Sequence, residues 1–173
     1  MAKKAKKSKI SVVGIGIAAV IVVCLVLSIV GVCIDTWTTT EELLGKTIDI
    51  SFSDYSERAE SIRDAKESAS EWGIEIESDS LLQPMVAFGY IAVIAAAVVA
   101  LLYVLKLFVK AGIFRFLTGG VGVLTFVAGI ILIAITASFC NDSSLVVGAG
   151  AILTSVGAMG AGLAGATALF LKK

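Results

Sequence analysis

The opening stretch MAKKAKKSKISVVGIGIAAV (residues 1–20) joins a cluster of lysines to the start of a long apolar block. Five lysines lie in the first nine positions, and no Asp, Glu, Lys or Arg follows from Ile10 to Ile34. The apolar region of a signal peptide is about 7–15 residues long and ends at a small-residue cleavage site. Because this block is much longer, we expect it to be retained as a membrane-spanning helix rather than cleaved.

Four such blocks explain why 58% of the residues are hydrophobic. They are residues 10–34, 81–105, 117–139 and 145–171, and none of them contains Asp, Glu, Lys or Arg. Each reaches the roughly 20 residues that cross about 30 Å of hydrocarbon. The sequence therefore predicts an all-α transmembrane four-helix bundle, with a small exofacial α/β segment between helices 1 and 2.

Basic and acidic residues are separated along the chain, although the formal net charge is zero. The segments 1–9, 106–116 and 172–173 contain ten basic residues and no acidic one, whereas the segments 35–80 and 140–144 contain all 14 acidic residues. Cytoplasmic loops of membrane proteins retain an excess of Lys and Arg. We therefore expect a multi-pass protein of the cell (plasma) membrane with both termini cytoplasmic and residues 35–80 and 140–144 outside.

Several classes of function are disfavoured by what the blocks lack. Charged residues at membrane depth mark proton relays, voltage sensors and ion pathways, because burying them is costly. The chain has no histidine, which excludes imidazole catalysis and His metal ligands, and its three cysteines form no CxxC motif. We expect no enzymatic activity, no cofactor and no nucleic-acid partner.

The fourth block is rich in small residues. Gly157, Ala161 and Gly165 recur every four residues. This spacing lets helix backbones approach closely, so that dispersion drives their association in lipid. Packing within one bundle is the preferred interpretation, and a self-association face is the alternative.

The exofacial segment combines two patterns. Residues 47–52 and 73–77 alternate apolar with polar side chains, which is typical of half-buried strands. Residues 55–72 have the composition of a helix, with Ser53 or Asp54 placed to cap its start. The segment therefore predicts two short strands with a helix between them.

The two faces of this helix differ. At 100° per residue, one face is an acidic stripe, and the other is apolar and basic, with Arg58, Arg63 and Lys66 among or beside its apolar residues. We expect this second face to dock on the sheet or on lipid headgroups. The acidic stripe comprises Glu57, Glu60, Asp64, Glu67 and Glu71, and the apolar side comprises Tyr55, Ala59, Ile62, Ala65, Ala69 and Trp72. A solvated surface is the ordinary interpretation of the stripe. The functional alternative is weak, salt-sensitive attraction of a cation or a basic partner.

Cys33 and Cys140 end the first and third predicted helices, near the outer boundary of the membrane. An exofacial location permits oxidation, so a disulfide between them and two separate thiols both remain open. Asn141-Asp142-Ser143 fits the glycosylation pattern. We expect no glycan there, because the loop is too short to reach far from the membrane.

The layout resembles the claudin superfamily, which includes the peripheral myelin and epithelial membrane proteins. The stretch GGVGVLTFVAGIILIAITASF (residues 119–139) is similar to that family's third helix in its leading glycines, central Ala-Gly and small polar ending. Trp37 lies about where the family has its first extracellular tryptophan, but the following Gly-Leu-Trp and the paired cysteines of the first loop are absent. The resemblance implies four helices, cytoplasmic termini, and a first extracellular segment with a small sheet and a helix.

These observations favour a non-enzymatic structural or interaction protein that acts by lateral assembly and exofacial contacts. Its partners would be the lipid bilayer and either further copies of the chain or another membrane protein. One alternative is a pore-forming channel or transport component, in which several copies line the pore with small polar groups. Another is an accessory subunit of a larger membrane complex.

The topology gives a first testable prediction. In a chain whose native cysteines are replaced, Ala5→Cys should not react with a membrane-impermeant thiol reagent on intact cells, whereas a cysteine introduced within residues 35–80 should react. Labelling at position 5 from outside would overturn the orientation.

Overall fold

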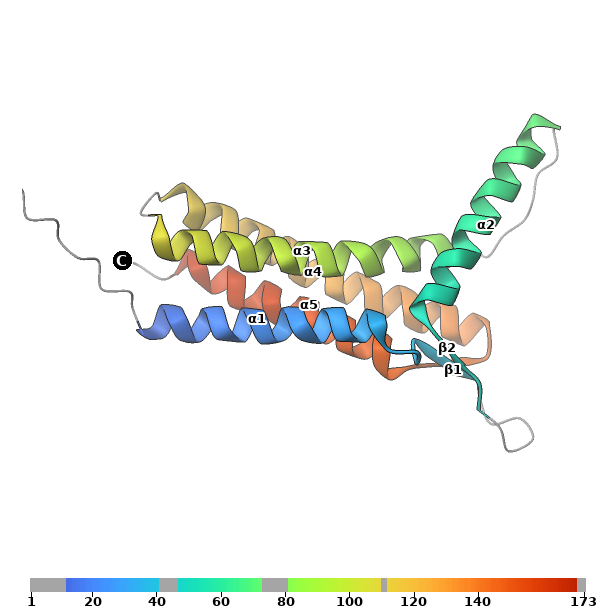
Figure 1. Cartoon of the computed structure of the whole chain (residues 1–173), viewed down its shortest axis with the longest axis horizontal. Coiled ribbons are helices and arrows are strands. Elements are labelled where there is room, and N and C mark those ends of the chain that lie inside the picture. The colour runs from blue at the N-terminus through green and yellow to red at the C-terminus, as the bar shows by residue number, and fades with distance from the viewer. Residues whose placement is uncertain (1–11, 41–46, 73–80, 110–111, 171–173) are drawn as a thin grey trace, which may run out of the picture.

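The computed structural model describes residues 12–40, 47–72, 81–109 and 112–170. Four long helices form a bundle: α1 (Val12–Cys33), α3 (Leu82–Phe108), α4 (Ile113–Asp142) and α5 (Ala149–Ala166), the last continued by the 3-10 turn η1 (Thr167–Leu169). The other elements are the strands β1 (Thr38–Thr40), β2 (Asp49–Ile50) and β3 (Leu145–Val147) and the helix α2 (Phe52–Glu71). Figure 1 shows the strands and α2 at one end of the bundle, here called the sheet end; α1 begins and η1 ends at the opposite, terminal end.

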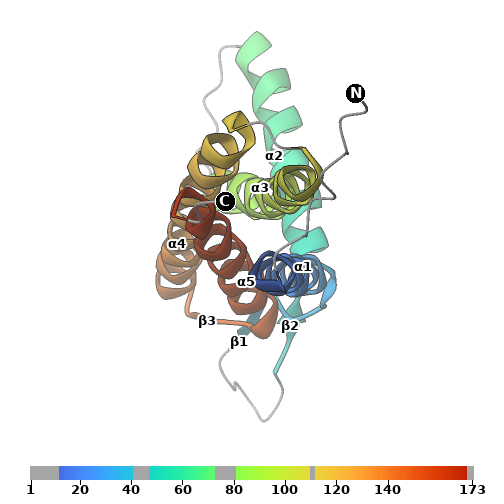
Figure 2. The ribbon, with the colours of Figure 1, turned by 90° about the vertical axis from the view of Figure 1, so that its left-hand side faces the viewer.

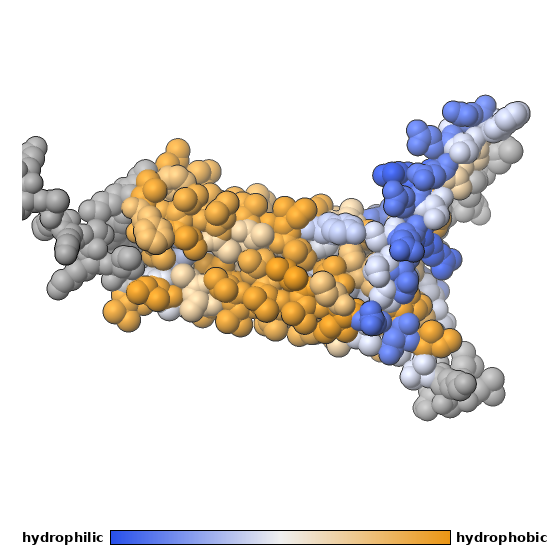
Figure 3. Space-filling view, in the orientation of Figure 1, coloured by the Kyte–Doolittle hydropathy of each residue, from blue (hydrophilic) through white to orange (hydrophobic). Residues whose placement is uncertain are grey.

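The four bundle helices are long and apolar enough to cross a membrane, which confirms the predicted fold class. Apolar side chains cover the length of the bundle in Figure 3, and polar residues gather on α2 and at the sheet end. Many large apolar side chains on the outside of the bundle, such as Val23, Ile94 and Leu124, are exposed in the isolated chain. An apolar belt of this kind is what lipid covers in an integral membrane protein.

Two helices extend beyond their predicted apolar blocks at the terminal end. The second predicted span ends before Lys106, and the third begins after Phe116. The observed α3 nevertheless includes Lys106, and α4 includes Arg115. Arg115 Nε donates to the Leu169 carbonyl at 2.9 Å, Arg115 Nη2 donates to the same oxygen, and Lys106 Nζ donates to the Ala168 carbonyl at 3.5 Å. The basic side chains of α3 and α4 thus satisfy the last carbonyls of the α5–η1 unit.

Helix α5 packs along both α1 and α4, while α3 lies against the other three, as the end-on view in Figure 2 shows. Glycines make these contacts close. A Cβ at Gly157 would lie 2.5 Å from the Cys24 carbonyl oxygen of α1, and one at Gly162 would lie 2.6 Å from the Gly122 carbonyl oxygen of α4. The predicted seam of Gly157, Ala161 and Gly165 is buried inside the bundle.

Two hydroxyl groups bridge α1 and α5 within this contact. Ser28 Oγ lies 3.3 Å from the Thr154 carbonyl oxygen, and Thr154 Oγ1 lies 3.3 Å from the Ser28 carbonyl oxygen. Each hydroxyl also has an acceptor in its own helix, at Cys24 or Gly150. Fully buried polar side chains are therefore satisfied where the two backbones meet.

The sheet joins segments that are far apart in the chain. Its order is β2-β1-β3, both pairings are antiparallel, and Thr38 of β1 faces Ile50 on one side and Val147 on the other. Backbone bonds continue into α5, since Gly148 N donates to the Trp37 carbonyl at 2.9 Å and Gly150 N donates to the Thr36 carbonyl at 2.8 Å. The exit of α1 is thus tied to the entry of α5.

Three further predicted boundaries, all at the sheet end, also change. The fourth span begins at Ala149, not at residue 145, because residues 145–147 pair with β1. The loop expected at 140–144 is shorter, since α4 runs to Asp142. The strand expected over 47–52 is limited to Asp49–Ile50, because Ser51 caps the helix that starts at Phe52. The second predicted strand, 73–77, lies outside the described residues.

A matched pair of glycines tests the packing of α4 on α5. A Cβ at Gly122 would lie 2.7 Å from Ala166 N, whereas one at Gly120 meets nothing within 4 Å. We expect Gly122→Ala to lower the free energy of unfolding by about 1–3 kcal/mol, the usual cost of overpacking, and Gly120→Ala to leave it nearly unchanged. Thermal unfolding in detergent, followed by circular dichroism, measures both; equal melting temperatures would contradict the close contact.

Candidate functional site

The start of α2 is fixed by a capping box between Ser51 and Asp54. Ser51 Oγ accepts from Asp54 N at 3.2 Å, and Ser51 N donates to Asp54 Oδ2 at 3.0 Å. The predicted caps, Ser53 and Asp54, are thus replaced by Ser51, three residues upstream of Asp54.

The capping box also depends on pH, because the side-chain and backbone bonds from Ser51 lower the pKa of Asp54. This support for the helix is present above the ordinary Asp pKa and is lost as the pH falls through the lowered value.

An aromatic cluster anchors the first two turns of α2. Phe52 packs between Trp37, with ring centroids 4.5 Å apart, and Tyr90 of α3, at 5.1 Å. Its ring occupies the space beside Gly89, where a Cβ would lie 2.5 Å from Phe52 Cε2. One turn later, the Tyr55 hydroxyl lies 2.7 Å from Thr38 Oγ1 of β1. Helix α2 is therefore held at its base by both the sheet and the bundle.

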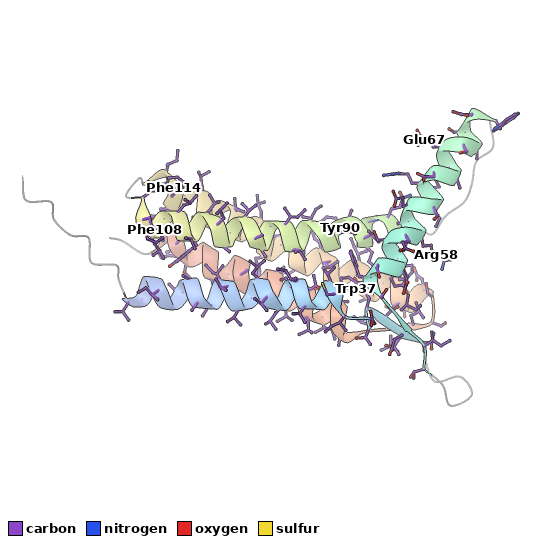
Figure 4. The ribbon with its side chains drawn as sticks, in the orientation of Figure 1. Trp37, Arg58, Glu67, Tyr90, Phe108 and Phe114 are labelled. Atoms are coloured by element: carbon purple, nitrogen blue, oxygen red, sulfur yellow. The ribbon has the colours of Figure 1, made fainter. Side chains whose placement is uncertain are left out.

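Trp37 is the centre of this anchor. Its side chain is fully buried, and its Nε1 has no hydrogen-bond partner among the described residues. Figure 4 shows it between the end of α1 and the base of α2. The residue matched by the claudin resemblance therefore lies in the core, where it links the sheet to α2. Burial also raises the pKa of the neighbouring Tyr55, although its bond to Thr38 acts in the opposite direction.

Beyond Ala59, α2 leaves the bundle. We call residues 60–72 the α2 arm. Ile62 is half-buried, but Ala65 is exposed and the Trp72 side chain is 81% exposed. Within the described residues, the apolar side of α2 packs on the sheet and the bundle mainly at its base, because a straight helix inclined to the bundle soon passes its edge (Figure 1). Docking of the remaining apolar residues on lipid headgroups stays a prediction.

The five carboxylates of the acidic stripe are all exposed. Arg63 lies near two of them, with Nη2 3.9 Å from Glu60 Oε1 and 3.7 Å from Asp64 Oδ1, and about two thirds of each of these side chains is exposed. Such pairs contribute little to stability. Among the described residues, no group of three or more His, Cys, Asp or Glu side chains could hold a metal ion. The stripe is a weak electrostatic surface.

The three cysteines are free thiols in this structure. Cys33 is exposed and Cys140 is buried, and the disulfide that the sequence left open is not formed. Cys24 is partly buried.

The glycosylation motif lies at the end of α4. Asn141 and Asp142 belong to the last turn of this helix, and Ser143 follows it. The predicted glycosylation motif is thus placed at a helix end beside the sheet.

Two features that position α2 were not predicted. β1 and β3 were missed, although the β-branched runs Thr38–Thr40 and Val146–Val147 were a signal for strands. The contact between α2 and α3 through Ser56 and Tyr90, whose hydroxyl oxygens lie 2.9 Å apart, has no sequence signal, because it depends on the angle at which α2 leaves the bundle.

The two tryptophans report directly on this arrangement. We expect acrylamide to quench Trp72 efficiently and Trp37 poorly, because one ring is exposed and the other is buried. Trp72→Phe should therefore leave blue-shifted, protected emission, and Trp37→Phe should leave red-shifted, quenchable emission. Equal protection of the two would mean that the α2 arm is packed along its length.

The described residues thus combine four apolar spans with a partly anchored, acidic helix. No family model, curated protein or solved structure matches the sequence. The spans make the chain an integral membrane protein.

Proposed function

We propose that this integral membrane protein has a non-enzymatic, claudin-like structural or interaction role in the plasma membrane. Bundles would assemble laterally, and the α2 arm would make contacts on the exofacial side, with both termini cytoplasmic. The observation that carries the proposal is the α2 arm, which extends from an anchored base and exposes Trp72 and all of the acidic stripe except Glu57, which is exposed just before the arm. Tryptophan is enriched among the residues that carry most of the binding energy at protein interfaces.

The exposure of α1 supports lateral assembly. In an apolar stretch of 18 residues within α1, only 17% of the residues are buried, compared with 44% in a stretch of the same length within the α5–η1 unit. Its outer surface carries many Val and Ile side chains, including Val20, Val23 and Ile29. β-branched side chains have few rotamers to lose, so this surface can pack against another helix at low entropic cost.

The acidic stripe supports a partner with positive charge. Five carboxylates at spacings of three and four repel one another by a few tenths of a kcal/mol per pair, and Arg63 is near only two of them. A basic surface on a neighbouring protein would relieve this repulsion. Since exposed charges are screened over about 8 Å at physiological ionic strength, the attraction should be sensitive to salt.

Charge removal on the acidic stripe tests the proposed contact. The variant changes Glu57, Glu60, Glu67 and Glu71 to Gln and Asp64 to Asn. The control, Asp35→Asn with Asp142→Asn, removes exposed carboxylates outside α2. Association between differently tagged copies, and with any co-purified membrane protein, is measured in bilayers at low and moderate salt. We expect the stripe variant to associate several-fold more weakly at low salt and the control to behave as wild type.

The same variants separate the proposed role from a pore. Unchanged association of the stripe variant at both salt concentrations would leave the stripe as a solvated surface and contradict the proposed contact. Purified protein is also examined in planar bilayers. Single-channel conductance whose cation selectivity falls in the stripe variant would assign the chain to a pore-forming class instead.

A further inference from the structure

A groove with a mixed polar and apolar lining lies in the angle between α2 and α3. Its volume is about 270 Å³, and its walls are formed by Ser56, Glu60 and Arg63 of α2 and by Gln83 and Ala87 of α3. Ala59 and Val86 also line it, and both are buried. The groove therefore has an apolar floor, and its polar walls come from two different helices.

The groove opens at the boundary between the apolar belt and the polar sheet end. Below it, α3 exposes Tyr90, Ile91 and Ile94, with Ile94 61% exposed, on the outer surface of the bundle. The Tyr90 hydroxyl bonds with Ser56, and Figure 4 shows Tyr90 on α3 near the base of α2. Tyrosine is enriched at the level of lipid headgroups, so this position places the groove beside the headgroups and the isoleucines beside the acyl chains.

Arg63 gives the groove hydrogen-bond donors. Its distances of 3.9 Å to Glu60 and 3.7 Å to Asp64 exceed hydrogen-bond length. The guanidinium therefore keeps donors available, and its planar fork matches the geometry of a phosphate. The Gln83 amide, which is exposed on the opposite wall, adds a neutral donor and an acceptor.

We propose that this groove binds the headgroup of a zwitterionic phospholipid. The phosphate accepts hydrogen bonds from Arg63, the ammonium group lies beside Glu60, and the acyl chains follow the exposed surface of α3 at Ile91 and Ile94. One guanidinium and one carboxylate in the walls match one phosphate and one ammonium group. Phosphatidylglycerol, an anionic lipid, lacks the ammonium group, so its phosphate would bind Arg63 but leave Glu60 without a positive partner from the lipid.

Lipid retention by the purified full-length chain tests this site. The protein is equilibrated in detergent with phosphatidylethanolamine and phosphatidylglycerol of identical acyl chains, and bound lipid is counted by native mass spectrometry. We expect wild type to retain several-fold more phosphatidylethanolamine. Arg63→Gln should lose this retention and Glu60→Gln should shift the preference toward phosphatidylglycerol.

The control is Arg58→Gln, which removes the same charge from the same helix. Arg58 is exposed and lies on the opposite side of α2 from positions 56, 60 and 63. It should retain lipid as wild type does, and circular dichroism checks that both variants keep their helices. Equal retention by Arg63→Gln and Arg58→Gln, or a wild-type preference for phosphatidylglycerol, would overturn the proposal.

Free phosphoethanolamine separates a lipid from a soluble phosphate compound. Because the acyl chains contribute contacts with α3, millimolar phosphoethanolamine should not displace the bound lipid. Displacement at concentrations comparable to those of the lipid itself would overturn the assignment to a membrane lipid.

Discussion

The close approach of α5 to its neighbours is the contact on which the rest of the structure depends. In lipid, apolar side chains gain little by moving from acyl chains to protein, so helices associate through dispersion and hydrogen bonds at short range. Gly157 meets the backbone of α1, and Gly162 meets that of α4, at distances that leave no room for a Cβ. The reciprocal contacts of Ser28 and Thr154 exist because the backbones are this near.

This packing also builds the sheet. Once α5 lies along α1, its first turn reaches the carbonyls of Thr36 and Trp37, and β3 is brought beside β1. Strands of two and three residues are not stable by themselves, but here the helices hold their ends in register. Trp37, fixed between these elements, then provides the surface on which Phe52 packs. The direction of α2 thus follows, through the sheet, from the packing of α5 on α1.

The sequence was sufficient for the four helices because about 20 uncharged apolar residues have few alternatives to spanning a membrane. It was insufficient where pairing is non-local: the β-branched Val146 and Val147 favour a strand, but they are also as apolar as a helix start, and their pairing with Thr38 and Thr39 decides between the two. The exposure of the acidic stripe followed from its spacing. The exposure of Trp72 did not, because nothing local indicates where the supporting surface ends. The groove was equally hidden, since Glu60 and Gln83 come together only through the angle between α2 and α3.

Arg63 connects the proposed groove with the proposed contact surface. It lines the groove and is also the cation nearest to Glu60 and Asp64 of the acidic stripe. A phosphate bound to Arg63 would neutralise that cation, while the ammonium group beside Glu60 would offset one carboxylate. The outer carboxylates, Glu67 and Glu71, lie beyond the groove and would keep their charge. A basic partner would therefore meet its strongest attraction at the far end of the α2 arm, next to Trp72, while the proposed lipid headgroup occupies the groove nearer the base of the helix.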